Sequence, residues 1–172
     1  YVLTATGGAA INGEANLTFD GDALELTGTV EYTLPTGFNQ FHGEIVTFGV
    51  QFIGGVQAGD LVSFGVDSGG TVWRRANFNS STTSTGLLGI ALGDDLSDGV
   101  LLRGVARSVA YSNFNIGNEL YIAGTAGDMT TTKPSSTGDY VRIVGACFAT
   151  GGSGLGAYGE IYFSPDNTYI LL

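Results

Sequence analysis

The chain has few chemically reactive side chains. Its 172 residues include one histidine, one cysteine, one tryptophan, one methionine and three prolines. A metal site with two histidines is impossible within one chain, and His42 is the only base for a histidine-containing catalytic triad. Cys147 has no partner for an intrachain disulfide, and its apolar neighbours predict a buried thiol. We therefore expect no catalytic residues, no resident cofactor and no enzymatic activity.

Charge is also scarce and strongly biased. Only 13% of the residues are charged, and six basic against sixteen acidic residues give a net charge of -10. Such a protein repels nucleic-acid phosphates and anionic membrane surfaces, and no run of about eighteen apolar residues is present. We expect neither nucleic acid nor a membrane as a partner. Arg74 and Arg75, beside Trp73, form the only basic pair; we expect them on a solvated strand, or facing an acidic partner or neighbouring subunit.

Glycine and short apolar segments are abundant. The chain holds 29 glycines and 43% hydrophobic residues, without the G-X-Y period of collagen. Apolar runs bounded by Gly, Asn, Asp and Ser recur about every eight to twelve residues, which is typical of β-sandwiches and barrels. We therefore predict an all-β fold with an antiparallel sandwich or barrel-like body. The expected strands are 15–19, 23–26, 29–33, 45–52, 61–66, 72–76, 86–92, 100–106, 119–123, 140–149, 160–163 and 168–171.

A strand-turn unit occurs twice, with a period of about 57 residues. Each copy has a Gly-Asp or Gly-Asn turn that opens an apolar strand, then a Ser/Thr-rich stretch, then an apolar strand with glycine at its second position. The first copy runs from Gly59 to Leu92 and the second from Gly117 to Phe148, with residues 80–85 and 130–137 as the Ser/Thr-rich stretches. We predict two related units in one body, joined by surface connections, and interpret the repetition as a sign of a building part.

The first 35 residues differ in composition from the rest. Small residues dominate positions 6–10, and a short hairpin is predicted around Asp20-Gly21-Asp22. Two short strands form at best a marginal hairpin, so we expect residues 1–35 to be an extended β segment for attachment, strand exchange or trimerisation, and residues 36–172 to form the body. The predicted assembly residues of this segment are Leu17, Phe19, Leu24 and Leu26.

Carboxylates give two possibilities for a site. Asp94, Asp95 and Asp98 are a calcium candidate, although their spacing matches no EF-hand and a solvated turn is the alternative. A catalytic carboxylate pair is not expected, because the remaining candidates lie mostly beside turn glycines, where backbone hydrogen bonds explain them. Those candidates are Asp60, Asp67, Glu119, Asp128, Asp139 and Glu160.

Aromatic residues outside strand centres are candidates for interaction. They are suited to stacking on sugar rings or on a neighbouring subunit, and the alternative is that they cap the ends of the core. The interaction candidates of the body are Trp73, Arg74, Phe114, Tyr158 and Tyr169.

Four sequence phrases resemble tailed-phage virion proteins, specifically capsid decoration and head-fibre modules. They are Gly59-Asp60-Leu61-Val62, Gly86-Leu87-Leu88-Gly89-Ile90-Ala91-Leu92, Gly99-Val100-Leu101-Leu102-Arg103-Gly104 and Gly117-Asn118-Glu119-Leu120-Tyr121-Ile122. The stretches Gly138-Asp139-Tyr140-Val141-Arg142-Ile143-Val144-Gly145 and Ile161-Tyr162-Phe163-Ser164-Pro165-Asp166-Asn167-Thr168-Tyr169 are similar to the ending of fibre-like proteins in this group.

The resemblance implies a non-enzymatic virion protein with a small β-barrel head. Members are commonly trimeric and decorate a capsid or terminate a fibre, so the expected partners are further copies of the chain and other virion proteins. A bacterial or archaeal extracellular, pilus-like fibre subunit that polymerises by N-terminal strand donation fits the low charge and the N-terminal hairpin equally well. A carbohydrate-binding β module, with a surface glycan as partner, is a second alternative.

Overall fold

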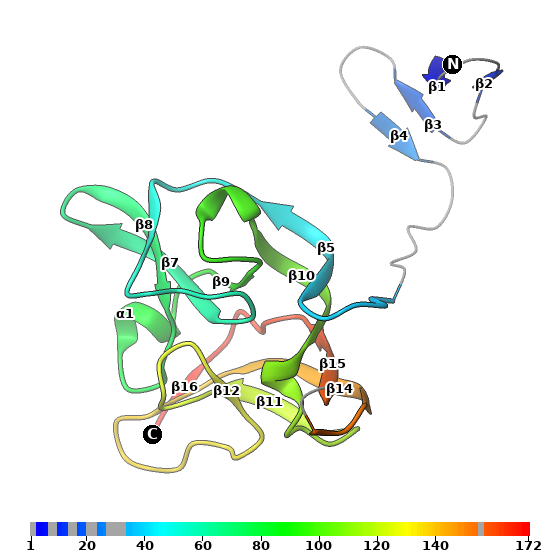
Figure 1. Ribbon diagram of the computed structural model, residues 1–172. Helices are drawn as coiled ribbons and strands as arrows, with labels where there is room; N and C mark the ends of the chain where they lie inside the picture. The colour runs from blue at the N-terminus through cyan, green and yellow to red at the C-terminus, as the bar shows by residue number, and fades with distance from the viewer. Residues whose placement is uncertain (1–2, 7–9, 14–16, 20–23, 27–33, 155–156) are drawn as a thin grey trace. The chain divides into compact units, whose positions relative to one another are not determined.

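The computed structural model divides the chain into two units, Tyr1–Glu31 and Tyr32–Leu172 (Figure 1). The boundary falls slightly before the position expected at Pro35. Pro35 is buried, and its carbonyl accepts a hydrogen bond from Arg107 Nη1 at 2.9 Å, so this proline belongs to the second unit, the body. The structure describes residues 3–6, 10–13, 17–19, 24–26, 34–154 and 157–172.

The described residues of the N-terminal unit form two two-stranded antiparallel sheets. β1 (Leu3–Thr6) pairs with β2 (Ala10–Gly13), and β3 (Leu17–Phe19) pairs with β4 (Leu24–Leu26). The hairpin expected from alternating apolar residues is confirmed in β3 and β4. Its turn and the expected strand 29–33 lie outside the described residues. The first sheet was not predicted, because small side chains give little strand signal.

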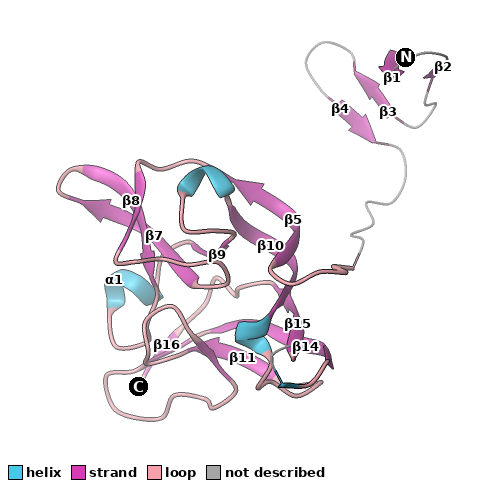
Figure 2. Ribbon diagram, viewed as in Figure 1, coloured by secondary structure: helices cyan, strands magenta, loops and turns pink. Residues whose placement is uncertain are grey.

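The body is built around one mixed sheet of ten strands, which confirms the all-β prediction. Among the described residues the helical pieces are short (Figure 2): α1 (Ser81–Ser84), η1 (Leu96–Asp98) and η2 (Val109–Tyr111). The sheet strands are β5 (Gln40–Val46), β6 (Gln51–Ile53), β7 (Leu61–Asp67), β8 (Gly70–Arg75), β9 (Leu88–Ala91), β10 (Val100–Ser108), β11 (Glu119–Ile122), β12 (Met129–Thr130), β14 (Ile143–Gly151) and β15 (Tyr158–Phe163). A separate small sheet pairs β13 (Tyr140–Val141) with β16 (Ile170–Leu171).

Strand β10 joins the two halves of the sheet. One of its edges pairs with β5 along most of its length, while the other edge pairs first with β9 and then with β15. The order across the sheet is β12-β11-β14-β15-β10-β9-β7-β8-β6, so the first repeat is reached through β9 at the start of β10 and the second through β15 at the end of β10. Gly43 of β5 and Gly104 of β10 lie opposite each other, and a Cβ atom on either would overlap the partner backbone.

Strand alternation sends apolar side chains to two clusters. Leu61 and Ile90 belong to the larger cluster, whereas the adjacent residues Val62 and Ala91 belong to the smaller one. Successive residues of a strand point to opposite faces, so the strands of the first repeat are covered on both sides. Besides Leu61 and Ile90 of the first repeat, the larger cluster takes Leu120, Ile122 and Val144 of the second repeat and Ile161 and Phe163 of β15. Burial of this shared cluster is what makes the body one folding unit.

Each repeat opens with the same tight turn. In the first copy the N–H of Asp60 donates to the carbonyl of Gln57 at 3.1 Å, and the Asp60 carboxylate accepts from the N–H of Gln57 at 3.0 Å. Asn118 and Asn115 make the same two hydrogen bonds in the second copy, at 3.0 Å each. The third residue of both turns is glycine, with φ of 92° and 87°, the region that a type II turn requires at this position.

The strands that follow these turns pair in the same register. Val62 lies opposite Gly89 in the first copy, and Leu120 lies opposite Gly145 in the second. The opening and closing strands of both copies are antiparallel neighbours in the sheet. The duplication predicted from the sequence is therefore present in the backbone, down to matched hydrogen bonds.

A third copy of the turn lies at 136–139. The N–H of Asp139 donates to the carbonyl of Ser136 at 3.1 Å, Asp139 Oδ2 accepts from the N–H of Ser136 at 3.0 Å, and the intervening Gly138 has φ of 93°. It opens β13, which pairs with β16 so that Tyr140 lies opposite Leu171. The sequence pointed to two copies only, because the third closing strand has no glycine.

The glycine of each closing strand is explained by a third strand, which pairs with the other edge of that closing strand. A Cβ atom on Gly89 would overlap the side chain of Val100 in β10, and one on Gly145 would overlap the carbonyl oxygen of Tyr162 in β15. In the third copy the corresponding residue is Ile170, and the pairing found for β16 is with β13. Glycine thus occurs where a further strand packs against the closing strand.

Two predicted strands are interrupted in the structure. The strand expected at 45–52 is divided into the end of β5 and β6, because the backbone turns at Gly49, which has φ of 121°. The strand expected at 140–149 is divided into β13 and β14 at Arg142, whose side chain is buried. The stretch 80–85 is not wholly a surface connection, since Thr83 and Ser84 are buried.

Candidate functional site

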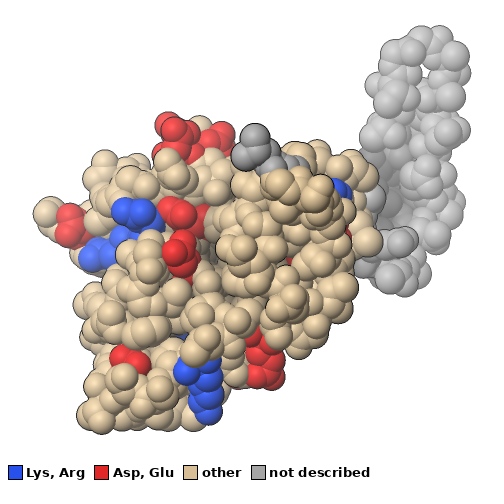
Figure 3. All heavy atoms as spheres, turned by 60° about the horizontal axis from the view of Figure 1, so that its bottom comes forward, with Lys and Arg blue, Asp and Glu red and all other residues tan. Residues whose placement is uncertain are grey.

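Residues other than Lys, Arg, Asp and Glu cover most of the face of the body shown in Figure 3, and the acidic and basic residues form a few small groups among them. Two kinds of feature on the body are suited to contact with other molecules. One is a polar hollow formed by three turns, and the other is a set of exposed apolar side chains.

The hollow has a volume of about 410 Å³. It lies between the turn 57–60, the segment 110–114 that includes the end of η2, and the segment 127–131 that includes β12. Its lining residues are Gly59, Asp60, Ala110, Tyr111, Asn113, Phe114, Gly127, Asp128, Met129, Thr130 and Thr131.

Two carboxylates line the hollow. Burial raises the pKa of the Asp60 carboxyl, and the charge of Asp128 raises it further, while the hydrogen bond from Gln57 and the charge of Arg75 act in the opposite direction. Gly127 makes room for this arrangement, since a Cβ atom there would lie 2.7 Å from Arg75 Cδ and 3.0 Å from Asp60 Cγ. The structure thus brings Asp60 and Asp128 to one hollow, although they are far apart in the sequence.

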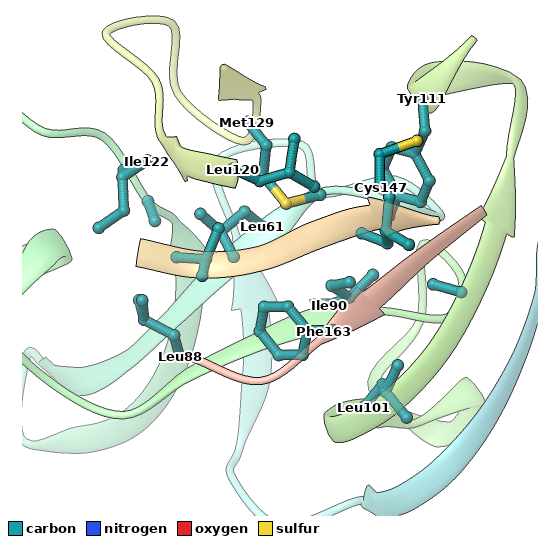
Figure 4. Packing of buried hydrophobic residues seen from close by; sticks show 14 residues of the cluster. Leu61, Leu88, Ile90, Leu101, Tyr111, Leu120, Ile122, Met129, Cys147 and Phe163 are labelled. Atoms are coloured by element: carbon teal, nitrogen blue, oxygen red, sulfur yellow. The ribbon is translucent and has the colours of Figure 1, made fainter. Parts of the chain in front are cut away.

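An aromatic pair forms the apolar part of the hollow. The rings of Tyr111 and Phe114 are stacked at 10°, with centroids 6.0 Å apart, and the hydroxyl of buried Tyr111 donates to the carbonyl of Gly59 at 3.0 Å. Burial raises the pKa of Tyr111, so its hydroxyl stays protonated. Figure 4 shows Tyr111 and Met129 among the residues of the larger core cluster. The base of the hollow is therefore the outer surface of the core.

Exposed apolar side chains gather beside the β7–β8 hairpin. Val50 and Val66 are 68% and 67% exposed, and Phe48 is partly exposed over Phe64 and Trp73. Trp73 was expected at an interaction surface, but it is fully buried in the smaller cluster and donates its indole N–H to the carbonyl of Phe48 at 2.8 Å. Strand alternation in β8 directs it inward, because Arg74, the next residue, takes the outward position.

The expected interaction residues Arg74 and Tyr158 contact their own chain. Arg74 Nη2 donates to the carbonyl of Val66 at 2.8 Å. Tyr158 lies under the guanidinium of Arg107, with 3.5 Å from its Cζ to the ring centroid, and Arg107 also forms an ion pair with Glu160 at 3.4 Å. These contacts were not foreseen, because they join residues of different strands.

Tyr169 is 47% exposed and its ring lies 5.7 Å from that of Tyr140, whereas Phe114 takes part in the hollow.

A nearby residue that the sequence did not single out is Arg142. Its buried side chain donates to the carbonyls of Ser84, Gly86 and Asp166, which joins α1 to the segment before β16. Burial lowers the pKa of Arg142, and the charges of Asp166 and Tyr169 act against that shift.

The side chains of Leu17, Phe19, Leu24 and Leu26 lie outside the described residues. The backbone register places Leu17 opposite Leu26 and Phe19 opposite Leu24. These four residues therefore occupy facing positions of one short ladder.

The calcium candidate is a helix cap in the structure. Asp95 accepts from the N–H of Ser97 at 2.8 Å, which lowers the pKa of Asp95, and Asp98 accepts from the N–H of Asp95 at 3.4 Å. Asp94 precedes this capping box. Over the described part of the chain, no three His, Cys, Asp or Glu side chains are grouped so that they could hold a metal ion.

The helices of the described segments are all too short or too polar to cross a membrane. Comparisons of the chain with protein-family models, with curated proteins and with solved structures find no match.

Proposed function

We propose that this protein is a non-enzymatic structural subunit that works by assembling with further copies of itself, and that it is a capsid decoration, head-fibre or fibre-tip protein of a tailed phage. The proposal is supported by the resemblance of its turn and strand phrases to such modules. It is also in keeping with a charge-poor body built from one repeated strand-turn unit.

The observation that carries the proposal is the size of the N-terminal unit. The two sheets that the structure describes in it have two strands each, of three or four residues. An isolated two-stranded hairpin is at best marginally stable in water, so these strands need a further surface or strand to pack against. A neighbouring protomer supplies such a surface, and an extended segment that joins a foreign sheet is an established mode of assembly.

The exposed apolar residues of the body are suited to the same purpose. Phe48 and Val50 come just before β6, which ends the ladder order of the sheet, and Val66 lies in β7, on the other side of β8. Burial of such side chains between protomers contributes roughly 25 cal/mol for each Å² removed from water. A closed trimer forms if the contacting surfaces are related by a three-fold axis.

The test is the oligomeric state of the full chain and of a variant that lacks residues 1–33. Analytical ultracentrifugation of the full chain is expected to give a discrete oligomer, and the truncated variant a folded monomer with an unchanged β-type circular dichroism spectrum. A variant with Val50→Ser and Val66→Ser, which keeps the N-terminal unit, reports separately on the body surface. A monomeric full chain, or an oligomer that persists after truncation, contradicts the role of the N-terminal unit.

Electron microscopy of the purified full chain separates two kinds of assembly. Closed trimers favour a decoration or fibre-tip protein. Open filaments favour the alternative, an extracellular fibre subunit that polymerises by donating its N-terminal strands.

A further inference from the structure

The hollow formed by residues 59–60, 110–114 and 127–131 has the dimensions of a small-ligand site. Ligand sites commonly range over roughly 300–1,000 Å³, and the hollow measures about 410 Å³. It has an apolar base, Tyr111 with Met129, and a polar rim of carboxylates, an amide and hydroxyl groups. A site that combines a ring surface with several hydrogen-bonding groups fits a ligand with both apolar and hydroxyl-bearing faces.

The turn at 125–128 differs from the three other turns in the use of its last side chain. In the turns that end at Asp60, Asn118 and Asp139, the side-chain oxygen accepts from the first residue of the turn. The turn at 125–128 has the same backbone hydrogen bond, from Asp128 to Thr125 at 3.2 Å. Among the described residues, the side chain of Asp128 makes no such hydrogen bond. It lines the hollow instead. The carboxylate of Asp128 is thus not needed to close its turn.

The charge of Asp60 is likewise more than its turn requires. Asn118 has the same position in the second turn and accepts the same backbone hydrogen bond, at the same 3.0 Å, with a neutral amide. The second carboxylate oxygen of Asp60 remains for another contact. The carboxylates of Asp60 and Asp128 therefore line one hollow, and the folding of their turns does not require the negative charge of either.

The charges around the hollow favour a neutral ligand. Two carboxylates repel anions, and the protein as a whole carries a net charge of -10. Arg75 lies near Asp60 and already offsets part of the negative charge, so a ligand cation is not required to balance it. Carboxylate oxygens accept from hydroxyl groups, and the amide of Asn113 and the hydroxyl of Thr131 both donate and accept.

We propose that this hollow binds a neutral saccharide. One face of a sugar ring packs against Phe114 beside Tyr111, and its hydroxyl groups donate to Asp60 and Asp128. Saccharide binding at this site is a function additional to assembly, and it does not depend on the oligomeric state of the chain.

The first experiment is binding of the labelled full chain to an array of immobilised neutral hexose and N-acetylhexosamine oligosaccharides, with sialylated and sulfated glycans on the same array. Binding to neutral glycans is expected. Isothermal titration with the best neutral oligosaccharide then gives the affinity for the unaltered chain and its variants, with spermidine as a cationic probe.

The decisive variants are Asp128→Asn and Asp60→Asn. Each keeps a side-chain oxygen, and Asn118 shows that the turn accommodates an amide, so both variants are expected to fold. We expect each to weaken saccharide binding at least about tenfold, which corresponds to about 1.4 kcal/mol. Phe114→Ala is expected to do the same, with its folding checked by circular dichroism.

The matched control is Asp139→Asn, which makes the same change in a turn outside the hollow, and it is expected to bind like the unaltered chain. The proposal is overturned if no neutral glycan binds, if acidic glycans or spermidine bind more tightly, or if Asp128→Asn and Asp60→Asn leave the affinity unchanged. Since the oligomeric state is measured separately, none of these results bears on assembly.

Discussion

Gly117 donates its backbone N–H to the carbonyl of Cys147 at 2.8 Å, and this bond repeats one that the first unit makes between Gly59 and Ala91 at the same distance. The bond ties the turn of each repeat to its closing strand, at Ala91 of β9 and Cys147 of β14. In the third copy Gly138 donates to Leu172 at 2.7 Å. One hydrogen-bonded arrangement therefore fixes three strand pairs of the body.

The close approach of β14 and β15 predicts a strong effect of a single methyl group. Gly145→Ala places a Cβ atom against the carbonyl oxygen of Tyr162, so the strands must separate. We expect a loss of about 3 kcal/mol in the free energy of unfolding, measured by urea denaturation. The control is Gly70→Ala, whose Cβ atom would meet its nearest neighbours at an ordinary 3.7 Å; it should change stability by less than about 0.5 kcal/mol.

The raised pKa of Asp60 predicts a pH-dependent effect of Asp60→Asn. A carboxyl whose pKa is higher in the folded than in the unfolded state binds protons more readily when folded, so its ionisation at neutral pH opposes folding. The variant keeps the turn and removes this charge. We expect its melting temperature to exceed that of the unaltered chain at pH 7, with the difference shrinking as the pH falls through the titration range of Asp60.

Asp60→Ala separates charge from hydrogen bonding in the same turn. It also removes the acceptor for the N–H of Gln57, and loss of such a side-chain cap costs about 1 kcal/mol. We expect Asp60→Ala to melt below Asp60→Asn at every pH. Equal melting curves for the two variants would show that the side-chain bond does not stabilise the turn.

Arg142 predicts a second strongly destabilising change. Arg142→Met keeps an apolar stem but leaves the buried carbonyl of Ser84 and the half-buried carbonyl of Gly86 without their donor. Buried polar groups without partners cost about 1–3 kcal/mol each, so we expect a loss of about 3 kcal/mol by urea denaturation. Arg74→Met, which removes a hydrogen bond at the surface, is expected to cost less than about 1 kcal/mol.

Trp73 provides a spectroscopic test of its placement. As the only tryptophan, fully buried and with its indole N–H bonded to Phe48, it should fluoresce at short wavelength and be poorly quenched by acrylamide. The truncated variant that lacks residues 1–33 should give the same emission, because the contacts of Trp73 come from the body. Efficient quenching in the native chain would place the indole at the surface instead.

The strands were predictable where alternation and turn glycines coincide. β3, β4, β7, β10 and β11 lie close to their expected positions, since their apolar spacing and their flanking turns agree. β12 and the first part of β5 were missed, because neither has a distinctive apolar pattern. The interruption at Arg142 was also missed, since the acceptors that hold this side chain lie far away in the sequence.

The candidate hollow was less predictable than the fold. Asp60 was correctly assigned to a turn, and Asp128 belonged to a group of carboxylates expected mostly at turns, yet the sequence did not indicate that the two residues lie beside one another. The backbone hydrogen bond from Leu61 to Gly127, at 2.7 Å, brings the turns together and depends on the order of strands in the sheet.

The sequence by itself determined the all-β class, the repeated turn and the shortage of reactive groups, because these depend on local backbone geometry and on composition. The tertiary structure decided which residues meet. It buried Trp73, brought a third copy of the turn to the segment that ends at Leu172, and gathered Asp60, Asp128 and the ring of Phe114 around one hollow. These outcomes depend on the pairing of strands distant in sequence, which the local pattern of residues does not encode.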